Sequence, residues 1–298
     1  MFGTGKIKKS KRLLFLALLL LLSAILGGCT TNKKDPGTPL SNSPPSLQPG
    51  YEQGAQQKKL DMPVYYVKIT ENDAYLVREV HQVPYTKEVA RAAIEELING
   101  TPSTPGAMKV LPPATKIIGI TIRDGMAAVN FSRDVLRANV GASGEALGIQ
   151  SIVNTLTEFP SVQKVSFLVE GKVDQESINW WGHVGLHEQP FTRDVSQVNE
   201  PAIWVTAPTA GQKIISPLTI KGSARVFEAT VSTRIVDESG QVLAQGFGTA
   251  TEGAPGRGDF VITLLFPASQ AGKGNLEVYW GSPRDGQDMD IVSIPVTW

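Results

Sequence analysis

The sequence predicts two folded domains of different class, an α+β domain followed by an all-β, immunoglobulin-like sandwich. Between residues 62 and 195, segments with an apolar residue at every second position, as in strands, take turns with segments that have the 3.6-residue apolar period of helices. From residue 200 to 298 we find no helical period, only seven short strand patterns separated by turn signals. A charged and apolar leader and a polar segment precede both domains.

Residues 1–29 have the three-part pattern of a secretory signal. Five basic residues between Lys6 and Arg12, with no acidic residue among them, precede an apolar run over residues 13–26. That run is shorter than the roughly 17–25 residues of a permanent membrane span, so it favours an export signal. It ends in Leu26-Gly27-Gly28-Cys29, which resembles the lipobox of bacterial lipoproteins. The resemblance implies attachment of lipid, palmitate included, to Cys29 and placement on the extracytoplasmic face of the cell membrane.

The cysteine count bears on disulfide bonds, and the charge count bears on the class of partner. Cys29 is the single cysteine, so no intramolecular disulfide is expected. Five of the 28 basic residues leave with the signal, and the remaining 23 face 28 acidic residues, a net charge of −5. Nucleic-acid binding relies on clustered Lys and Arg, so nucleic acid is not an expected partner.

Residues 30–61 read as a disordered tether. They are rich in Pro, Gly, Ser and Gln and contain few residues that could build a core. A coil of this length reaches about 30 Å, enough to hold a folded domain clear of lipid headgroups.

The α+β domain begins with a strand hairpin and a helix. Strand patterns at 64–70 and 74–80 flank a turn at Asn72-Asp73. Residues 86–100 read as a helix that Thr86 can cap and that Asn99-Gly100 ends. Its apolar stripe consists of Ala90, Ala93, Ile94, Leu97 and Ile98.

A second hairpin, helix and strand complete this domain. Residues 117–131 contain Asp124-Gly125, a strong hairpin signal. Residues 144–159 form an amphipathic helix pattern that Pro160 ends, and 165–169 read as a strand. The order ββ-α-ββ-α-β predicts an α+β fold with two helices packed on a sheet.

The second domain, residues 200–298, is read entirely as strands. The seven patterns are at 202–207, 217–224, 228–237, 241–250, 259–266, 274–280 and 289–297. This number and spacing are typical of an immunoglobulin-like sandwich. The cysteine pair of antibody domains is missing, so only the architecture is implied.

Both domains resemble modules of spore-forming bacteria. Residues 148–172, which include "TLTEFPSV" and "LVEGK", together with 127–136 resemble the second half of a GerMN domain of sporulation and spore germination. Residues 203–224 and 262–296 resemble the Gmad-type immunoglobulin-like domain that accompanies it. The resemblance implies a role in spore formation or germination at the membrane and brings no known catalytic activity. It also implies similarity of the first domain to ring-building modules that assemble side by side.

The stretch "WWGHVGLHEQP" at residues 180–190 is the most tempting metal site. His183 and His187 are four residues apart, and Glu188 follows. They would share a face only on a helix, which Gly182 and Gly185 oppose. Zinc proteases place a glutamate between the histidines, and no third ligand is near in the sequence. We therefore expect a loop that packs its tryptophans on the domain and binds no metal.

The other motifs lack residues that a catalytic site would require. Residues 141–145 lack the final glycine of a nucleophile elbow, and "GAPGRG" lacks the Lys-Ser/Thr of a phosphate loop. Arg257-Gly258-Asp259 spells an adhesion tripeptide, which we interpret as coincidence. We expect a solvated helix face to hold Glu88, Glu95 and Glu96. The sequence thus predicts a non-enzymatic protein without catalytic residues, metal or cofactor.

Two functions remain open. The first is an assembly or scaffold lipoprotein that binds envelope or sporulation proteins, or a second copy of itself, through domain surfaces and sheet edges. Lys87, Arg91 and Glu95, which point away from the apolar stripe, are then candidate docking residues in residues 62–195. The alternative is a lipoprotein that binds cell wall or a small ligand in an aromatic groove. Its candidate residues are Trp204, Tyr279, Trp280 and Trp298.

Overall fold

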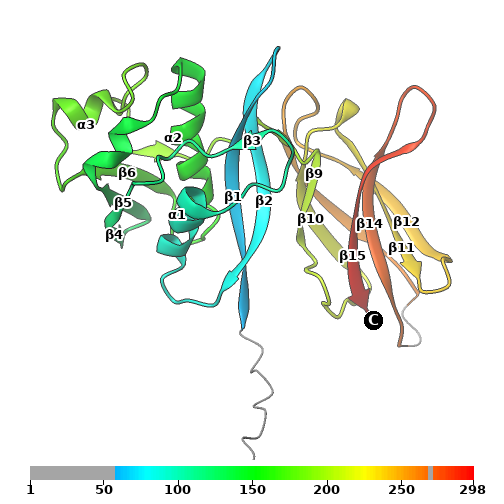
Figure 1. The fold of residues 1–298 in the computed structure, drawn as a ribbon. Coiled ribbons are helices and arrows are strands. Elements are labelled where there is room, and N and C mark those ends of the chain that lie inside the picture. The colour runs from blue at the N-terminus through cyan, green and yellow to red at the C-terminus, as the bar shows by residue number, and fades with distance from the viewer. Residues whose placement is uncertain (1–57, 268–270) are drawn as a thin grey trace, which may run out of the picture. The chain divides into compact units, whose positions relative to one another are not determined.

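The computed structural model describes residues 58–267 and 271–298 (Figure 1). The expected signal, the lipid-attachment residue Cys29 and nearly all of the tether lie outside the described residues. Ala55–Trp298 forms one compact unit. In the described ranges, none of the helices has the length and hydropathy that a membrane span requires.

The first sheet contains the N-terminal hairpin. β1 (Lys59–Ile69) pairs antiparallel with β2 (Ala74–Pro84) around the expected turn. A two-residue strand, β3 (Ala107–Met108), lies on the other side of β1. β8 (Val198–Glu200) pairs in parallel with β2, which gives the order β3-β1-β2-β8.

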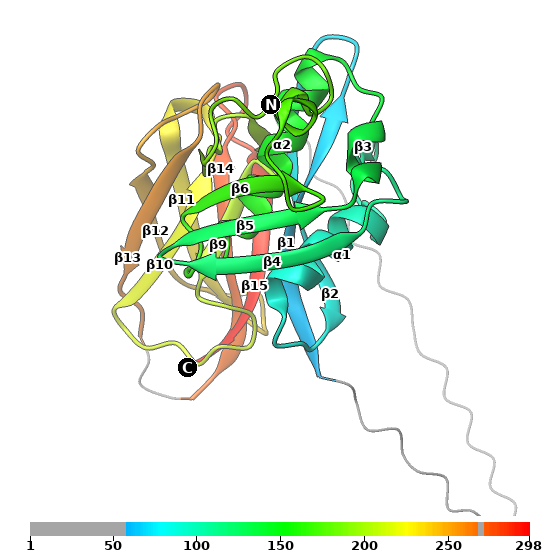
Figure 2. The same ribbon diagram turned by 90° about the vertical axis from the view of Figure 1, so that its left-hand side faces the viewer.

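The second sheet has the order β4-β5-β6-β7. β4 (Ile117–Arg123) and β5 (Met126–Phe131) form the expected hairpin, whose turn residues Asp124 and Gly125 both have positive φ. That geometry is the reason why Asp-Gly favours tight hairpins. β6 (Lys164–Val169) pairs in parallel with β5, and β7 (Phe191–Thr192) pairs with β6. Figure 2 shows β4, β5 and β6 side by side.

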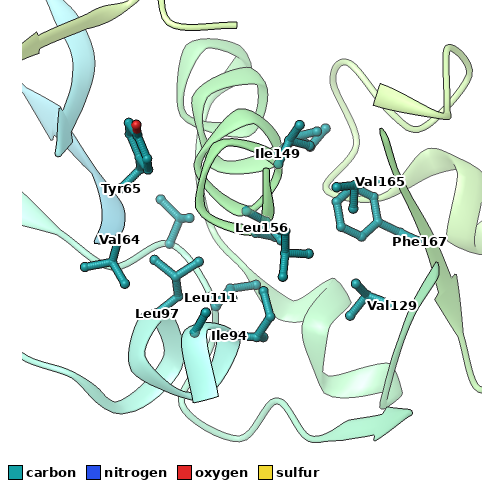
Figure 3. Packing of buried hydrophobic residues seen from close by; sticks show 14 of the residues in the cluster. Val64, Tyr65, Ile94, Leu97, Leu111, Val129, Ile149, Leu156, Val165 and Phe167 are labelled. Carbon is teal, nitrogen blue, oxygen red and sulfur yellow. The ribbon is translucent and has the colours of Figure 1, made fainter. Parts of the chain in front are cut away.

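Helix α2 (Ala142–Leu156) connects β5 to β6, because parallel neighbours require a crossover. Figure 3 shows Ile149 and Leu156 with Val64 and Tyr65 on one side and Phe167 on the other. The helix is therefore buried between two sheets, whereas the sequence suggested one sheet with two helices on it. The α+β class and the order of the expected elements are confirmed.

Helix α1 (Val89–Asn99) buries the expected apolar stripe, and Gly100 follows its end. It begins at Val89, so Thr86 is not its N-cap: the Thr86 hydroxyl accepts the N–H of Glu88, outside the helix. A short helix, α3 (Gln175–Asn179), was not expected from the sequence. Its capping box consists of Asp174 and Ser177.

The C-terminal region contains the seven expected strands. They are β9 (Ile203–Ala207), β10 (Leu218–Ala224), β11 (Thr230–Asp237), β12 (Val242–Thr249), β13 (Gly258–Leu264), β14 (Lys273–Gly281) and β15 (Asp288–Thr297). They form two sheets, with orders β13-β10-β9 and β12-β11-β14-β15. Residues alternate between buried and exposed along β13, as expected of a sandwich strand with one face in the core.

Candidate functional site

The loop that contains "WWGHVGLHEQP" packs both tryptophans into the core. Trp180 and Trp181 are 3% and 7% exposed. The Trp180 ring lies 5.4 Å from that of Phe167, and the Trp181 indole N–H donates to the Val135 carbonyl. His183 and His187 are exposed. The segment acts as a packed loop, as its sequence indicated.

A fully buried carboxylate fixes this loop. Glu145, in the first turn of α2, accepts the backbone N–H groups of His183 and Gly185, each at 2.7 Å. A buried charge is tolerated only when it is hydrogen-bonded in this way. This role of Glu145 was not predicted from the sequence. The available signal was that Glu145 is the single charged residue of α2.

The loop histidines are not gathered into a ligand set. His183 Nε2 lies 3.0 Å from the Val140 carbonyl oxygen. Across the described ranges, no group of three His, Cys, Asp or Glu side chains is arranged to hold a metal ion.

A second cluster, not anticipated from the sequence, surrounds the third histidine. His81 on β2 lies between two carboxylates, with Nδ1 2.7 Å from Glu96 Oε1 and Nε2 2.7 Å from Glu79 Oε2. Carboxylates accept hydrogen bonds, and both ring nitrogens can donate at once only when the imidazole is protonated. Burial lowers the pKa of His81, but its hydrogen bonds to the two carboxylates outweigh burial and raise that pKa. Hydrogen bonds from His81, Ser103 and Thr104 overcome burial and lower the pKa of Glu79 to about 2.

The adhesion-like tripeptide is not displayed. Arg257 is 6% exposed, and its guanidinium donates to the carbonyls of Val198, Pro201 and Ala202. It also stacks on the Trp204 ring, 3.9 Å from the centroid. A buried arginine cannot be read by a receptor, so the geometry agrees with the interpretation of this tripeptide as coincidence.

The four aromatic residues proposed to line a ligand groove do not form one. Trp204 is buried beneath Arg257, and Tyr279 lies under the Arg234 guanidinium. The Trp280 indole donates to Asp290, and Trp298 packs edge-on against Phe266. Trp204 and Trp298 border two different cavities, so the four residues do not line a common groove.

The candidate docking residues on α1 do share an outward face. Lys87, just before the helix, and Glu95 are exposed. Arg91 is half-buried: its guanidinium pairs with Glu88 at 3.1 Å and donates to the Ile117 carbonyl of β4. The face that was expected to be solvated therefore contacts the edge of β4 through Arg91. No pattern in the sequence indicated this contact. Glu88 and Glu95 lie on this face, while Glu96 turns inward to His81.

Comparison with protein families finds matches for two regions of the described chain. Residues 63–175 match the family described as sporulation and spore germination. Residues 202–287 match the immunoglobulin-like domain of bacterial spore germination. The chain carries both domains. These matches confirm the resemblance inferred from the sequence and the fold class that it implied. We call the first region the sporulation domain and the second the immunoglobulin-like domain.

Relatives cover mainly the sporulation domain. The spore germination protein GerM of Bacillus subtilis strain 168 is 28% identical over 107 residues, which are 35% of this chain and 29% of that protein. The tandem GerMN domains of the sporulation protein GerM from Bacillus subtilis align with a TM-score of 0.40 and 29% identity over 49% of each chain. The first GerMN domain of that protein aligns with a TM-score of 0.38 and 24% identity, covering 45% of this chain and 98% of the other.

Proposed function

We propose that this protein is a non-enzymatic lipoprotein, anchored on the extracytoplasmic face of the membrane, that acts in sporulation or spore germination by binding other proteins. The observation that carries the proposal is the presence of two spore-germination domains in one chain, behind a leader that ends in Leu26-Gly27-Gly28-Cys29. GerM of Bacillus subtilis, to which the chain is 28% identical over 107 residues, is a spore germination protein.

The buried carboxylates are occupied by hydrogen bonds within the fold, which supports a non-catalytic role. Glu145 bonds to loop backbone, and Glu79 to His81 and the Ser103–Thr104 backbone. Glu158 accepts hydrogen bonds from the Tyr65 hydroxyl and from Arg78 and Arg193. Catalytic acids and bases need a proton-transfer partner in reach of substrate, and these carboxylates are saturated by the fold.

The α1 face is the surface that we propose for docking, with the immunoglobulin-like domain as a spacer or second contact. Lys87→Glu with Glu95→Lys reverses two exposed charges, which should change stability by no more than about 0.5 kcal/mol. The same pair should weaken capture of partner proteins from sporulating cells, because rim charges govern encounter and orientation. Lys172→Glu with Glu71→Lys, also exposed and outside α1, is the matched control. Equal capture by both variants would reject the α1 face.

The anchor has its own test. Cys29→Ala should leave an unprocessed precursor that takes up no radiolabelled palmitate, because the acyl chains are attached through the thiol. Normal processing and labelling of the variant would reject the lipoprotein proposal.

A further inference from the structure

Strand β4 leaves one side of its sheet open. It is the terminal strand in the order β4-β5-β6-β7 and pairs only with β5 among the described strands. The backbone groups on the far side of such a strand can pair with another chain. One of them, the Ile117 carbonyl, already accepts a hydrogen bond from the Arg91 guanidinium at 3.1 Å.

The core face of this sheet also continues onto β4, where its cover is incomplete, although Ile120 still packs against the core cluster. Ile120 and Ile122 stand opposite Val129 and Ala127 of β5, both of which are fully buried. Ile122 is nevertheless 40% exposed. Beta-branched apolar residues on the inner face of an edge strand are typical of a position that another strand covers.

A groove lies where that strand would sit. A cavity of 380 Å³ is bordered on one side by residues 87–91, at the start of α1, and on the other by Gly119, Ile120 and Ile122 of β4. We call it the α1–β4 groove. Gly119 has no side chain, and a Cβ there would meet no atom within 4 Å. Peptides that add a strand to a sheet edge occupy such sites, with backbone hydrogen bonds for affinity and alternate side chains in pockets.

We propose that the α1–β4 groove binds an extended segment of a partner protein by strand addition to β4. This inference rests on the proposed protein-binding function and specifies its site and the chemistry of its partner. The segment has alternating apolar residues, which cover Ile120 and Ile122, and acidic residues near its ends.

The charges around β4 favour a bound segment with acidic residues at its ends. Four basic side chains border the strand and groove: Lys87, Arg91, Lys116 and Arg123. Two acidic ones oppose them, Glu88, which pairs with Arg91, and Asp124 in the turn. The local excess of positive charge favours an acidic segment.

The same charges disfavour a second copy of β4 as the occupant. An antiparallel pair of β4 strands in the register that sets Lys116 of one copy opposite Arg123 of the other would place like charges opposite one another at both ends of the pair. Like charges directly opposite one another destabilise a strand pair.

The test uses a fluorescent peptide, Glu-Val-Thr-Val-Thr-Val-Glu, and the full chain in detergent micelles, with binding followed by anisotropy. We expect saturable binding, and a Kd at least about fivefold weaker for a peptide with lysine in place of both glutamates. Ile122→Glu should weaken binding at least about tenfold by charging the groove, and Ile118→Glu by less than about twofold. Ile118 is the matched control because it is 49% exposed on the same strand and does not line the groove.

A second variant, which reverses two exposed charges, tests the proposal even if Ile122→Glu does not fold. Lys87→Glu with Arg123→Glu changes exposed residues only, and it should invert the preference toward the lysine-ended peptide. Absence of saturable binding, equal loss with Ile118→Glu, or an unchanged charge preference overturns the proposal. A dimer in sedimentation experiments that Ile122→Glu dissociates assigns the groove to a second copy and also overturns it. If the peptide fails while reversal of the α1 charges still abolishes partner capture, only the groove is wrong and the docking function stands.

Discussion

Three buried charged side chains, Glu79, Glu145 and Arg257, each hold a segment distant in the sequence. Glu145 binds the N–H groups of residues 183 and 185, and Arg257 binds carbonyls of residues 198–202. Each is stabilised because hydrogen bonds replace the lost hydration. Their roles could not be predicted from the sequence, since the partners are backbone groups whose identity leaves no trace in residue type. The packing of Trp180 and Trp181 was predictable, because large apolar side chains seek the core.

The His81 cluster predicts a pH-dependent stability. The groups that face His81 are Glu79 from its own strand, Glu96 from α1 and the Tyr66 ring from β1. Because folding raises the pKa of His81, its contribution is complete below the unfolded value of about 6.5 and is lost as pH rises through the folded value. Folding lowers the pKa of Glu79 from 4.5 to about 2, so its contribution is lost only as pH falls across that range.

We therefore expect the free energy of unfolding to be maximal between about pH 4.5 and 6.5 and to fall as pH rises through the raised pKa of His81. His81→Leu should lower the maximum and remove the alkaline decline. Urea unfolding at a series of pH values measures both effects. His187→Gln, at an exposed position, should keep the decline. If the free energy of unfolding of His81→Leu still falls at alkaline pH, groups other than His81 cause the fall.

The elements with strong periodicity were predictable, and the pairings between them were not. The seven C-terminal strands, both hairpins and both long helices follow from local patterns and turn residues. The strands β3, β7 and β8 have two or three residues each, too few for a periodic signal. The division into two sheets around α2 depends on which strands pair, and a single sequence does not encode that choice locally.

The close packing of α2 against the tryptophan loop predicts that a larger residue at Gly148 destabilises the protein. Gly148 lies beneath Trp181, and an added Cβ would collide with the indole and lie 3.0 Å from Val110 Cγ2. Gly148→Ala should therefore destabilise the protein by about 1–3 kcal/mol through overpacking, although alanine favours a helix by about 1 kcal/mol. Thermal and urea unfolding measure the change.

A double-mutant cycle tests the cause. Trp181→Leu removes the colliding ring atoms, so Gly148→Ala in that background should cost less than it does in the parent. Gly119→Ala, where a Cβ has open space, is the control for glycine replacement. Additive effects of Gly148→Ala and Trp181→Leu would contradict direct collision.

At the scale of the whole folded unit, the sporulation and immunoglobulin-like domains share core contacts. Trp204 belongs to β9 of the immunoglobulin-like domain, yet it packs in the core cluster of the sporulation domain. Two guanidiniums lie near its ring, that of Arg257 at 3.9 Å and that of Arg78 at 5.2 Å from the centroid. Arg78 in turn pairs with Glu158. Ala55–Trp298 is accordingly one compact unit, and the domain resemblance gave no indication of this coupling.

This arrangement predicts that the two domains unfold together and that Arg257 is the link. Burial lowers the pKa of Arg257 to about 9, so it is still charged at neutral pH and can hold three carbonyls and the Trp204 ring. Arg257→Met keeps much of the packing volume but removes these bonds, and should cost about 2–4 kcal/mol. Calorimetry of the full chain should show one transition for the parent and two for Arg257→Met, because each domain then melts on its own core. Arg284→Met, at an exposed position of the immunoglobulin-like domain, should retain the single transition. Two separate transitions in the parent, or one unshifted transition in Arg257→Met, would show that the domains are not coupled through this arginine.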